Sequence, residues 1–395
     1  MTGRKSRRKT TIPVGLLYSL TGTYGIMGLE MFNGAMLGID LINENPDYDF
    51  QLRPVVMDPG GSIPEYGRQC AALISDHGVR HIIGCYTSAS RKQVLPLVEG
   101  NGVLLWHSAR YEGFESSENI IYVGAAPNQH VVPLALYVLN NLDPRVYCIG
   151  SNYVWTWEIN RVMQDILSAG GGKIEVERLI ALGETALDHM VEDIAAQRPG
   201  AVLNTLVGES AYSFYSAWHA ACAQRPDLAA IPMLSLSLCE AELGLIGPHQ
   251  GGHLVSSVYF QSIDRPENIE FLSRYRARHK EFGSPSVDTE AAYLCATLLG
   301  RAIAAAGTDD VASVKDALYR DRLDAPQGPV TVDPENNHSY LTPRLGRSTP
   351  EGDFNIIWEA PGPVKPDPYL AWLDIDELAK QSATTLHKEP FRLLL

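Results

Sequence analysis

Small polar and aromatic residues follow two apolar runs of this chain, and they are the residues best placed to do chemistry. The runs, residues 81–83 and 103–106, are each predicted to form a strand. The residues of interest after them are Tyr86, Thr87, Ser88, His107, Ala109 and Arg110. In an open α/β sheet, ligands bind just beyond the carboxyl ends of the strands. These positions therefore predict a binding site for a small molecule.

Three aromatic residues follow a further predicted strand at residues 145–150. They are Tyr153, Trp155 and Trp157, and we expect them in a loop rather than on a helix stripe. Aromatic side chains with a few polar groups are typical of ligand sites. This segment therefore predicts one wall of the site.

Several of these residues also have ordinary structural roles. Ser88 stands between a strand and a helix, where a serine commonly caps the helix; alternatively, its hydroxyl and nearby backbone N–H groups hold a ligand carbonyl or carboxylate. His107 is equally a ligand contact or a satisfied polar residue. Arg91 and Lys92 are interpreted as solvated, with an anion-binding role as the alternative.

The usual catalytic and cofactor motifs are absent from the sequence. No Gly-x-Gly-x-x-Gly follows the first predicted strand, and there is no His-Glu-x-x-His. The segment at residues 208–212 resembles a nucleophile elbow but lacks its second glycine. The glycines at residues 170–172 are interpreted as the end of a helix. We therefore predict a receptor rather than an enzyme, with no catalytic residues, cofactor or metal.

Composition limits the partners of the chain. Its 395 residues predict two to three domains, and its formal net charge of −14 argues against direct binding of nucleic acid. No run approaches the roughly 18 uninterrupted apolar residues of a membrane span, so no membrane partner is expected. Paired arginines near the N-terminus are also found in export signals, but the following run is short and contains Pro13. We interpret it as the first strand and expect a cytoplasmic protein.

The six cysteines form no Cys-x-x-Cys pair and are expected to be reduced and mostly buried. Along the chain, strand-like and helix-like patterns alternate, restart after about residue 130, and become rich in helices after Phe260. This alternation predicts an α/β protein with parallel sheets covered by helices on both faces. The repeat of the scheme predicts two similar lobes.

Several segments resemble a known family. They are residues 58–61, 84–88, 91–92, 111–115, 126–129, 149–153, 324–330, 336–339 and 366–369. In order and type they resemble the AmiC-like amide receptors that regulate aliphatic amidase operons. Similar families are the urea and short-chain amide receptors of ABC transporters. The resemblance covers nearly the whole chain.

The resemblance implies a type I periplasmic-binding-protein fold: two doubly wound parallel-sheet lobes joined by three crossover strands. The crossovers are expected near residues 124–128, 259–262 and 332–340. Lobe 1 would comprise residues 11–125 and 261–333, and lobe 2 residues 126–260 and 334–375. Residues 1–10 are expected to form a basic disordered tail and residues 376–395 a C-terminal tail.

The resemblance also implies the site and its use. The family's ligand-holding serine and tyrosine match Ser88 and Tyr153, and Trp155 matches a second aromatic. His107 stands where the family has a tyrosine, and Ala109 where it has a threonine, so the ligand is less certain than the position of the site. The implied ligand is a small amide- or urea-like molecule.

The implied role is control of a protein partner. In the family, the receptor sequesters an RNA-binding antiterminator of an amidase or nitrile-degradation operon until the ligand binds. The alternative is the substrate-binding receptor of a urea or short-chain amide ABC transporter. The residues leave the oligomeric state open, a homo-oligomer included.

Overall fold

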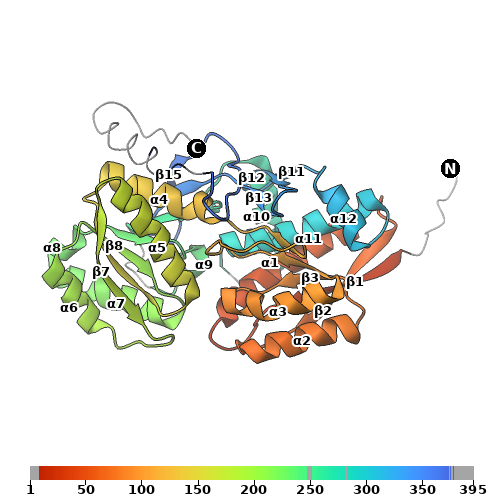
Figure 1. Ribbon diagram of the computed structural model, residues 1–395, viewed down its shortest axis with the longest axis horizontal. Helices are drawn as coiled ribbons and strands as arrows, with labels where there is room; N and C mark the ends of the chain where they lie inside the picture. Colours follow the sequence, from red (N-terminus) through yellow and green to blue (C-terminus); the bar gives the residue numbers. More distant parts are fainter. Residues whose placement is uncertain (1–8, 247–250, 281–282, 373, 375–376, 378–395) are drawn as a thin grey trace.

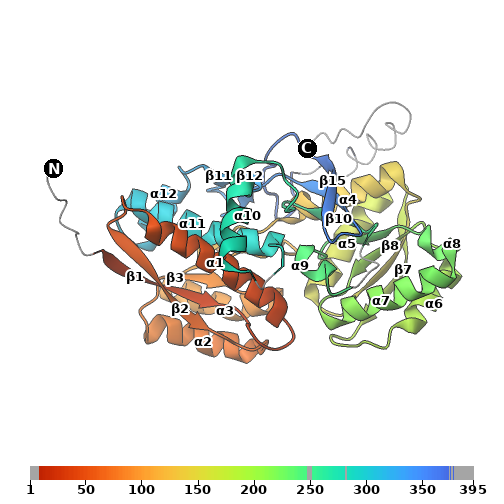
Figure 2. The ribbon, with the colours of Figure 1, turned by 180° about the vertical axis from the view of Figure 1, so that it is seen from behind.

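The computed structural model describes residues 9–246, 251–280, 283–372, 374 and 377. Two α/β lobes lie side by side, with the crossover segments along one edge of the molecule (Figures 1 and 2). The expected tails, residues 1–10 and 376–395, lie almost entirely outside the described residues.

Lobe 1 contains a sheet of five parallel strands in the order β2-β1-β3-β4-β5. Its inner strands are continuous apolar runs, as expected for strands that are covered on both faces. The carboxyl ends of β3 and β4 therefore meet at the same edge of the sheet. The strands are β1 (Thr10–Leu17), β2 (Phe50–Met57), β3 (His81–Gly84), β4 (Leu104–His107) and β5 (Ile120–Tyr122).

Two pairs of helices cover the two faces of this sheet. One pair is α2 (Ile63–Ser75) and α3 (Ser88–Asn101); the other is α1 (Gly25–Glu44) and α11 (Val287–Ala306), beside α10 (Pro266–Arg278) and α12 (Val311–Leu318). The helices α1 and α11 approach closely because Gly34 and Gly38 lie against backbone carbonyls of α11. By length and composition α1 could cross a membrane, but 61% of its apolar 18-residue stretch is buried within the protein.

Lobe 2 contains a seven-stranded sheet in the order β15-β14-β10-β9-β8-β6-β7. Five adjacent strands are parallel, β14 next to them is antiparallel to both of its neighbours, and β15 forms the edge. The predicted parallel sheet is thus extended at this edge by an antiparallel pair, and a short turn rather than a helix joins β14 to β15. The strands are β6 (Arg145–Ser151), β7 (Lys173–Ile180), β8 (Ala201–Thr205), β9 (Met233–Ser235), β10 (Leu254–Ser257), β14 (Arg344–Ser348) and β15 (Phe354–Glu359).

The helices of lobe 2 also cover both faces of its sheet. One side carries α4 (Pro127–Asn141) and α5 (Val154–Ala169); the other carries α6 (Asp188–Gln197), α7 (Glu209–Gln224) and the short α8 (Pro226–Ala229). A second short helix, α9 (Glu240–Leu243), lies toward lobe 1 (Figure 1). The α/β fold predicted from the alternation is confirmed.

The chain passes between the lobes at three places: after β5, after β10 and after β12. A small sheet at the junction consists of β11 (Leu323–Ala325), β12 (Gly328–Val332) and β13 (Ser339–Tyr340). The third passage is fixed to lobe 1, since His338 forms a parallel bridge with Tyr122 at the end of β5. The lobes are therefore linked by several strands rather than by one flexible linker.

Candidate functional site

The turn from β3 into α3 forms the lobe 1 side of the site. Cys85 adopts a left-handed backbone with φ of 66°, which is uncommon outside glycine and often found at functional sites. Thr87 is the N-cap, and its side chain accepts a hydrogen bond from the Ser90 N–H at 3.1 Å. Ser88 is thus the first helical residue and not the cap, so its hydroxyl is available for another role.

The Ser88 hydroxyl donates a hydrogen bond to Oε2 of Glu112, and both side chains are buried. Glu112 belongs to an ion cluster with Arg91, Lys92 and Glu115: Arg91 contacts Glu112 at 3.2 Å and Glu115 at 2.6 Å. Although burial raises the pKa of Glu115, Arg91 outweighs it and holds that pKa at about 2. The interpretation of Arg91 as solvated was therefore wrong, because two carboxylates compensate its burial; Lys92 remains half-exposed.

The lobe 2 side of the site comes from the start of α5. Tyr153 is the residue before the helix, and Trp155 lies in its first turn; their rings stack with centroids 6.2 Å apart. The expectation of a loop was wrong, since the helix begins at Val154 directly after the strand turn. Trp157 is 49% exposed and donates its Nε1 hydrogen bond to Asn152, so it is no part of the wall.

A cavity of about 20 Å³ lies between these two sides. It is lined by Tyr86, Thr87, Ser88, Arg110, Tyr153, Trp155, Val207 and Ser237. Six of the eight residues predicted for ligand binding are thus brought together. The space holds about one water molecule, so a solute of several atoms enters only when the lobes separate or side chains move.

Val207 and Ser237 were missed by the sequence analysis. They follow β8 and β9, at the carboxyl edge of the lobe 2 sheet. The rule that selected the lobe 1 residues, polar or small residues beyond parallel strands, applies to Ser237 but not to the apolar Val207. Ser237 could therefore have been predicted from the sequence, whereas Val207 could not.

Arg110 connects the two lobes at the cavity. Its Nη2 donates a hydrogen bond to the backbone carbonyl of Ser237 in lobe 2 at 2.8 Å and lies 3.6 Å from Asp288 in lobe 1. Burial lowers the pKa of Arg110, but Asp288 outweighs it, so the net shift is upward. Glu242 in α9 is close enough to interact with this charge, and its pKa, raised mainly by burial, is about 7. The one charged side chain that lines the cavity is therefore already compensated.

His107 and Ala109 do not line the cavity. His107 is fully buried within lobe 1, where its ring is 3.3 Å from Arg91 and packs edge-on against Tyr111 and Tyr122. Burial, followed by the charge of Arg91, lowers the pKa of His107 to about 3, so the ring is neutral. Of the two roles considered for His107, the structure shows the structural one: a buried polar residue whose ring nitrogens contact Arg91 and the Gly84 carbonyl. Ala109 is part of the lobe 1 core.

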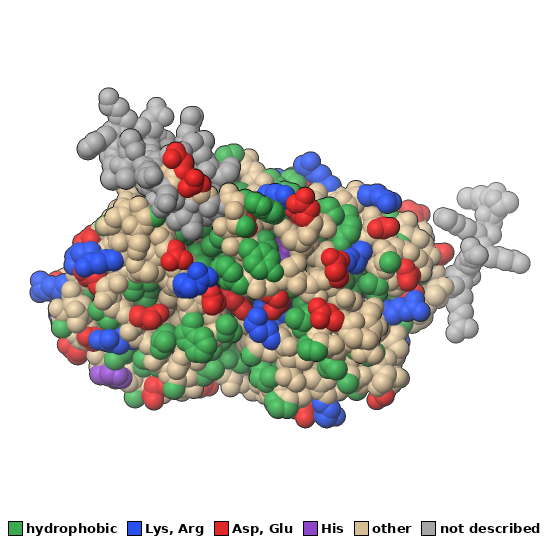
Figure 3. All heavy atoms as spheres, in the orientation of Figure 1, with side chains coloured by type: hydrophobic (Ala, Val, Ile, Leu, Met, Phe, Trp, Pro, Cys, Tyr) green, Lys and Arg blue, Asp and Glu red, His purple; other side chains and the backbone are tan. Residues whose placement is uncertain are grey.

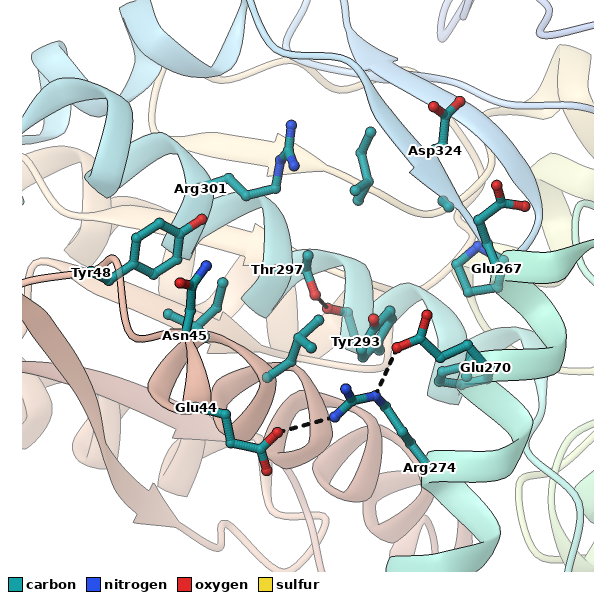
Figure 4. Close-up of a pocket in the computed structure, with 16 residues that line it drawn as sticks. Glu44, Asn45, Tyr48, Glu267, Glu270, Arg274, Tyr293, Thr297, Arg301 and Asp324 are labelled. Atoms are coloured by element: carbon teal, nitrogen blue, oxygen red, sulfur yellow. Dashed lines mark hydrogen bonds and ion pairs between the residues drawn. The ribbon is translucent and has the colours of Figure 1, made fainter.

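A second, larger cavity of about 540 Å³ lies entirely in lobe 1, among α1, α10, α11 and β11 (Figure 4). Its central cation, Arg274, forms ion pairs of 3.1 Å with both Glu44 and Glu270. Arg301 is paired with Asp321 at 2.5 Å. The cations of this cavity are thus engaged within the lobe, and none of the residues predicted for ligand binding lies there.

Within the described residues, no group of three or more His, Cys, Asp or Glu side chains could hold a metal ion. All six cysteines are free, and five of them are buried. Acidic and basic side chains are interspersed on the face shown in Figure 3.

Two α/β lobes that enclose a small polar cavity define a solute-binding protein. The sequence matches the family model described as "Periplasmic binding protein domain" over residues 12–374. The chain therefore belongs to the periplasmic-binding-protein family, and its predicted type I fold is confirmed. This membership also confirms that it is a binding protein rather than an enzyme. The narrower resemblance to amidase regulators stays a prediction.

Individual relatives are distant. The Leu/Ile/Val-binding protein homolog 6 of Brucella abortus is 23% identical over 337 residues, which cover 83% of this chain and 85% of the relative. A protein named limonene hydroxylase from Geobacillus stearothermophilus is 27% identical over 128 residues, but the match spans only 32% of this chain and 23% of that protein.

Solved structures show the same fold. A solute-binding protein of an ABC transporter from R. palustris, in complex with 4-hydroxybenzoate, has a TM-score of 0.80 at 21% identity and covers 90% of this chain and 98% of its own. A leucine-binding protein from Thermotoga maritima has a TM-score of 0.75 at 16% identity, with coverage of 88% and 98%.

Proposed function

We propose that this protein is a receptor that closes its two lobes over a small, uncharged solute bearing an amide or urea group. The observation that carries the proposal is the cavity between the lobes. Lobe 1 contributes the hydroxyls of Thr87 and Ser88, and lobe 2 contributes the aromatic rings of Tyr153 and Trp155. Neither lobe alone would enclose a solute.

The charges around the cavity favour a neutral solute. Arg110 is the one ionised side chain in the lining, and it is already bonded to the Ser237 carbonyl and paired with Asp288. An anionic solute would compete with these contacts, and a buried charge without a partner is costly.

The first turn of α3 suits the carbonyl of such a solute. The backbone N–H groups of Ser88 and Ala89 come before the first intrahelical hydrogen bond, which runs from Arg91 to Thr87. Such N–H groups at a helix start readily bind oxygen atoms. A planar amide or urea would place its oxygen there and its flat face against Tyr153 and Trp155.

We favour a role in which the protein delivers the solute to an ABC transporter, because the solved structures of similar fold include solute-binding proteins of such transporters. The second candidate is regulatory: in the cytoplasm, the protein would bind an RNA-binding antiterminator and release it when the solute binds. The six free cysteines support it, because thiols persist in a reducing compartment.

A thermal-shift panel tests the solute class. Acetamide, propionamide and urea are compared with benzoate, 4-hydroxybenzoate and leucine. A ligand that binds only the folded state stabilises it in proportion to the logarithm of its excess over Kd. We expect a rise in Tm with at least one amide or urea. Stabilisation by the carboxylates alone would contradict the proposal.

The two uses are separated by a capture experiment. The protein is mixed with the product of a neighbouring regulator gene, with and without the solute found in the panel. In the regulatory role, solute and partner weaken each other reciprocally. Capture that is unaffected by solute would leave transport as the better account.

A further inference from the structure

We propose that Glu112, which does not line the cavity, determines the class of solute by committing the only proton of the Ser88 hydroxyl. This inference rests on the proposed function and deepens it. With its proton engaged, the Ser88 oxygen presents only lone pairs to the cavity. The site then accepts an N–H donor from the solute and rejects a carboxylate.

The contacts of Glu112 are specific at each oxygen. Its Oε2 accepts the hydrogen bond from Ser88, and its Oε1 accepts one from Nη2 of Arg91 at 3.2 Å. Glu112 is 1% exposed and Ser88 is 3% exposed, so water does not replace either partner. Since a hydroxyl has a single proton, this bond leaves Ser88 with acceptor capacity alone.

The ion cluster holds Glu112 as an acceptor. Arg91 is fully buried beside it, and the Lys92 ammonium lies 3.8 Å from its Oε1. A buried carboxylate is tolerated when cations and hydrogen-bond donors compensate it in this way. Ser88 is therefore set between a fixed acceptor behind it and the cavity in front.

This arrangement distinguishes solutes of nearly equal shape. A primary amide donates an N–H to Ser88 while its carbonyl accepts from the N-terminus of α3. A carboxylate of the same size has no proton to donate, so its second oxygen faces the Ser88 lone pairs and the charge of Glu112 behind them. A site built around a required hydrogen bond discriminates strongly against the analogue that cannot form it.

The test replaces Glu112 by its neutral isostere. In Glu112→Gln, the carbonyl oxygen of the new amide is needed by Arg91, which can only donate. The amide NH₂ then faces Ser88 and donates to it, which frees the Ser88 proton for the cavity. The variant should therefore accept a carboxylate where the wild-type protein requires an amide.

Glu115→Gln is the matched control. It removes the same charge from the same cluster, since Glu115 also pairs with Arg91 and Lys92, but Glu115 does not contact Ser88. Kd values for acetamide against acetate, and for propionamide against propionate, are measured by calorimetry on all three proteins. The amide-to-carboxylate preference should fall about ten-fold or more in Glu112→Gln and stay within about three-fold in Glu115→Gln.

Each outcome decides the inference. An equal preference in the two variants would overturn the role of Glu112 while leaving the proposed function intact. A wild-type protein that binds neither these amides nor urea would overturn both. If Glu112→Gln does not fold, Glu112→Asp keeps the charge but withdraws it from Ser88; the preference should again fall, and an unchanged preference would refute the inference.

Discussion

Two cavities of the described part of this molecule differ in more than their volume. The cavity between the lobes has a volume of about 20 Å³, and the cavity within lobe 1 about 540 Å³. In the larger one, Arg274 is bonded to Glu44 and Glu270 of the same lobe (Figure 4). In the smaller one, hydroxyls and rings from both lobes converge, and Arg110 bonds across the gap. Convergence of polar groups from two bodies is the better mark of a binding site.

The difference has a mechanical basis. Groups contributed by two lobes are brought together only when the lobes close, so a solute held by both sides favours the closed state by its difference in affinity for the two states. Groups contributed by one lobe are already in place before any solute arrives. The comparison thus predicts which substitutions affect binding and which affect only local packing.

The largest effect is expected at the cavity between the lobes. Ser88→Ala should weaken solute binding by about 1–3 kcal/mol, or roughly 5- to 150-fold, because a buried polar group of the solute loses its partner. Tyr153→Ala should weaken binding by a similar amount, because it removes the ring that packs against the solute. Calorimetry with the best amide of the panel measures this loss.

A control for these variants lies in the larger cavity. Thr297→Val removes a buried hydroxyl that donates a hydrogen bond to the Tyr293 carbonyl of its own helix, and it should leave Kd unchanged. If Thr297→Val weakened binding as much as Ser88→Ala, the assignment of the two cavities would be reversed. Ser88→Ala should also destabilise the fold, since it removes the donor to Glu112.

A smaller effect is expected from pH. Burial raises the pKa of Glu242 from 4.5 to about 7, and those of Glu240 and Glu290 to about 8. Folding therefore favours the protonated forms, and this stabilisation is lost as pH rises through the raised values. Buried histidines such as His81, whose pKa burial lowers from 6.5 to about 4, change the free energy of unfolding in the opposite direction, but only below about pH 6.5. The free energy of unfolding should thus fall between about pH 6.5 and 8.

Calorimetric thermal unfolding at several pH values measures this slope, since urea is itself a candidate solute. Glu242→Gln, which removes the titrating group that interacts with Arg110, should flatten the slope, and a slope equal to that of the wild-type protein would show that Glu242 does not titrate in this range.

The smallest effect is expected in the larger cavity. Arg274→Ala removes ion pairs whose partners are well exposed, so the free energy of unfolding should fall by no more than about 1 kcal/mol. Solute affinity should stay unchanged. A clear loss of affinity would show that the two cavities are coupled, which the separation of their charges does not predict.

The sequence predicted the lining of the cavity between the lobes best where one rule applied directly. Residues beyond the ends of β3 and β6 were expected at the ligand, and Thr87, Ser88 and Tyr153 line the cavity. The fold was predictable from apolar runs alternating with helical stripes. The antiparallel strand β14 was not predicted, because its sequence, Arg344–Ser348, contains neither an apolar run nor an apolar alternation.

The remaining errors have physical causes. A strand buried on both faces offers no alternation, so the direction of the His107 side chain was not predictable. The burial of Arg91 depends on Glu112 and Glu115, which are more than twenty residues away in sequence and approach only in the folded lobe. Contacts of this kind require the tertiary structure.

The bond from Arg110 to lobe 2 ends on a main-chain oxygen and not on a side chain. Every residue type offers the same carbonyl, so the identity of the residue at position 237 is free to change during evolution without loss of this contact. The side chain of Ser237 meanwhile lines the cavity. In the proposed receptor, the contact that joins the lobes and the side chain that faces the solute would thus be separate parts of one residue, so a substitution at position 237 would change the cavity and keep the contact.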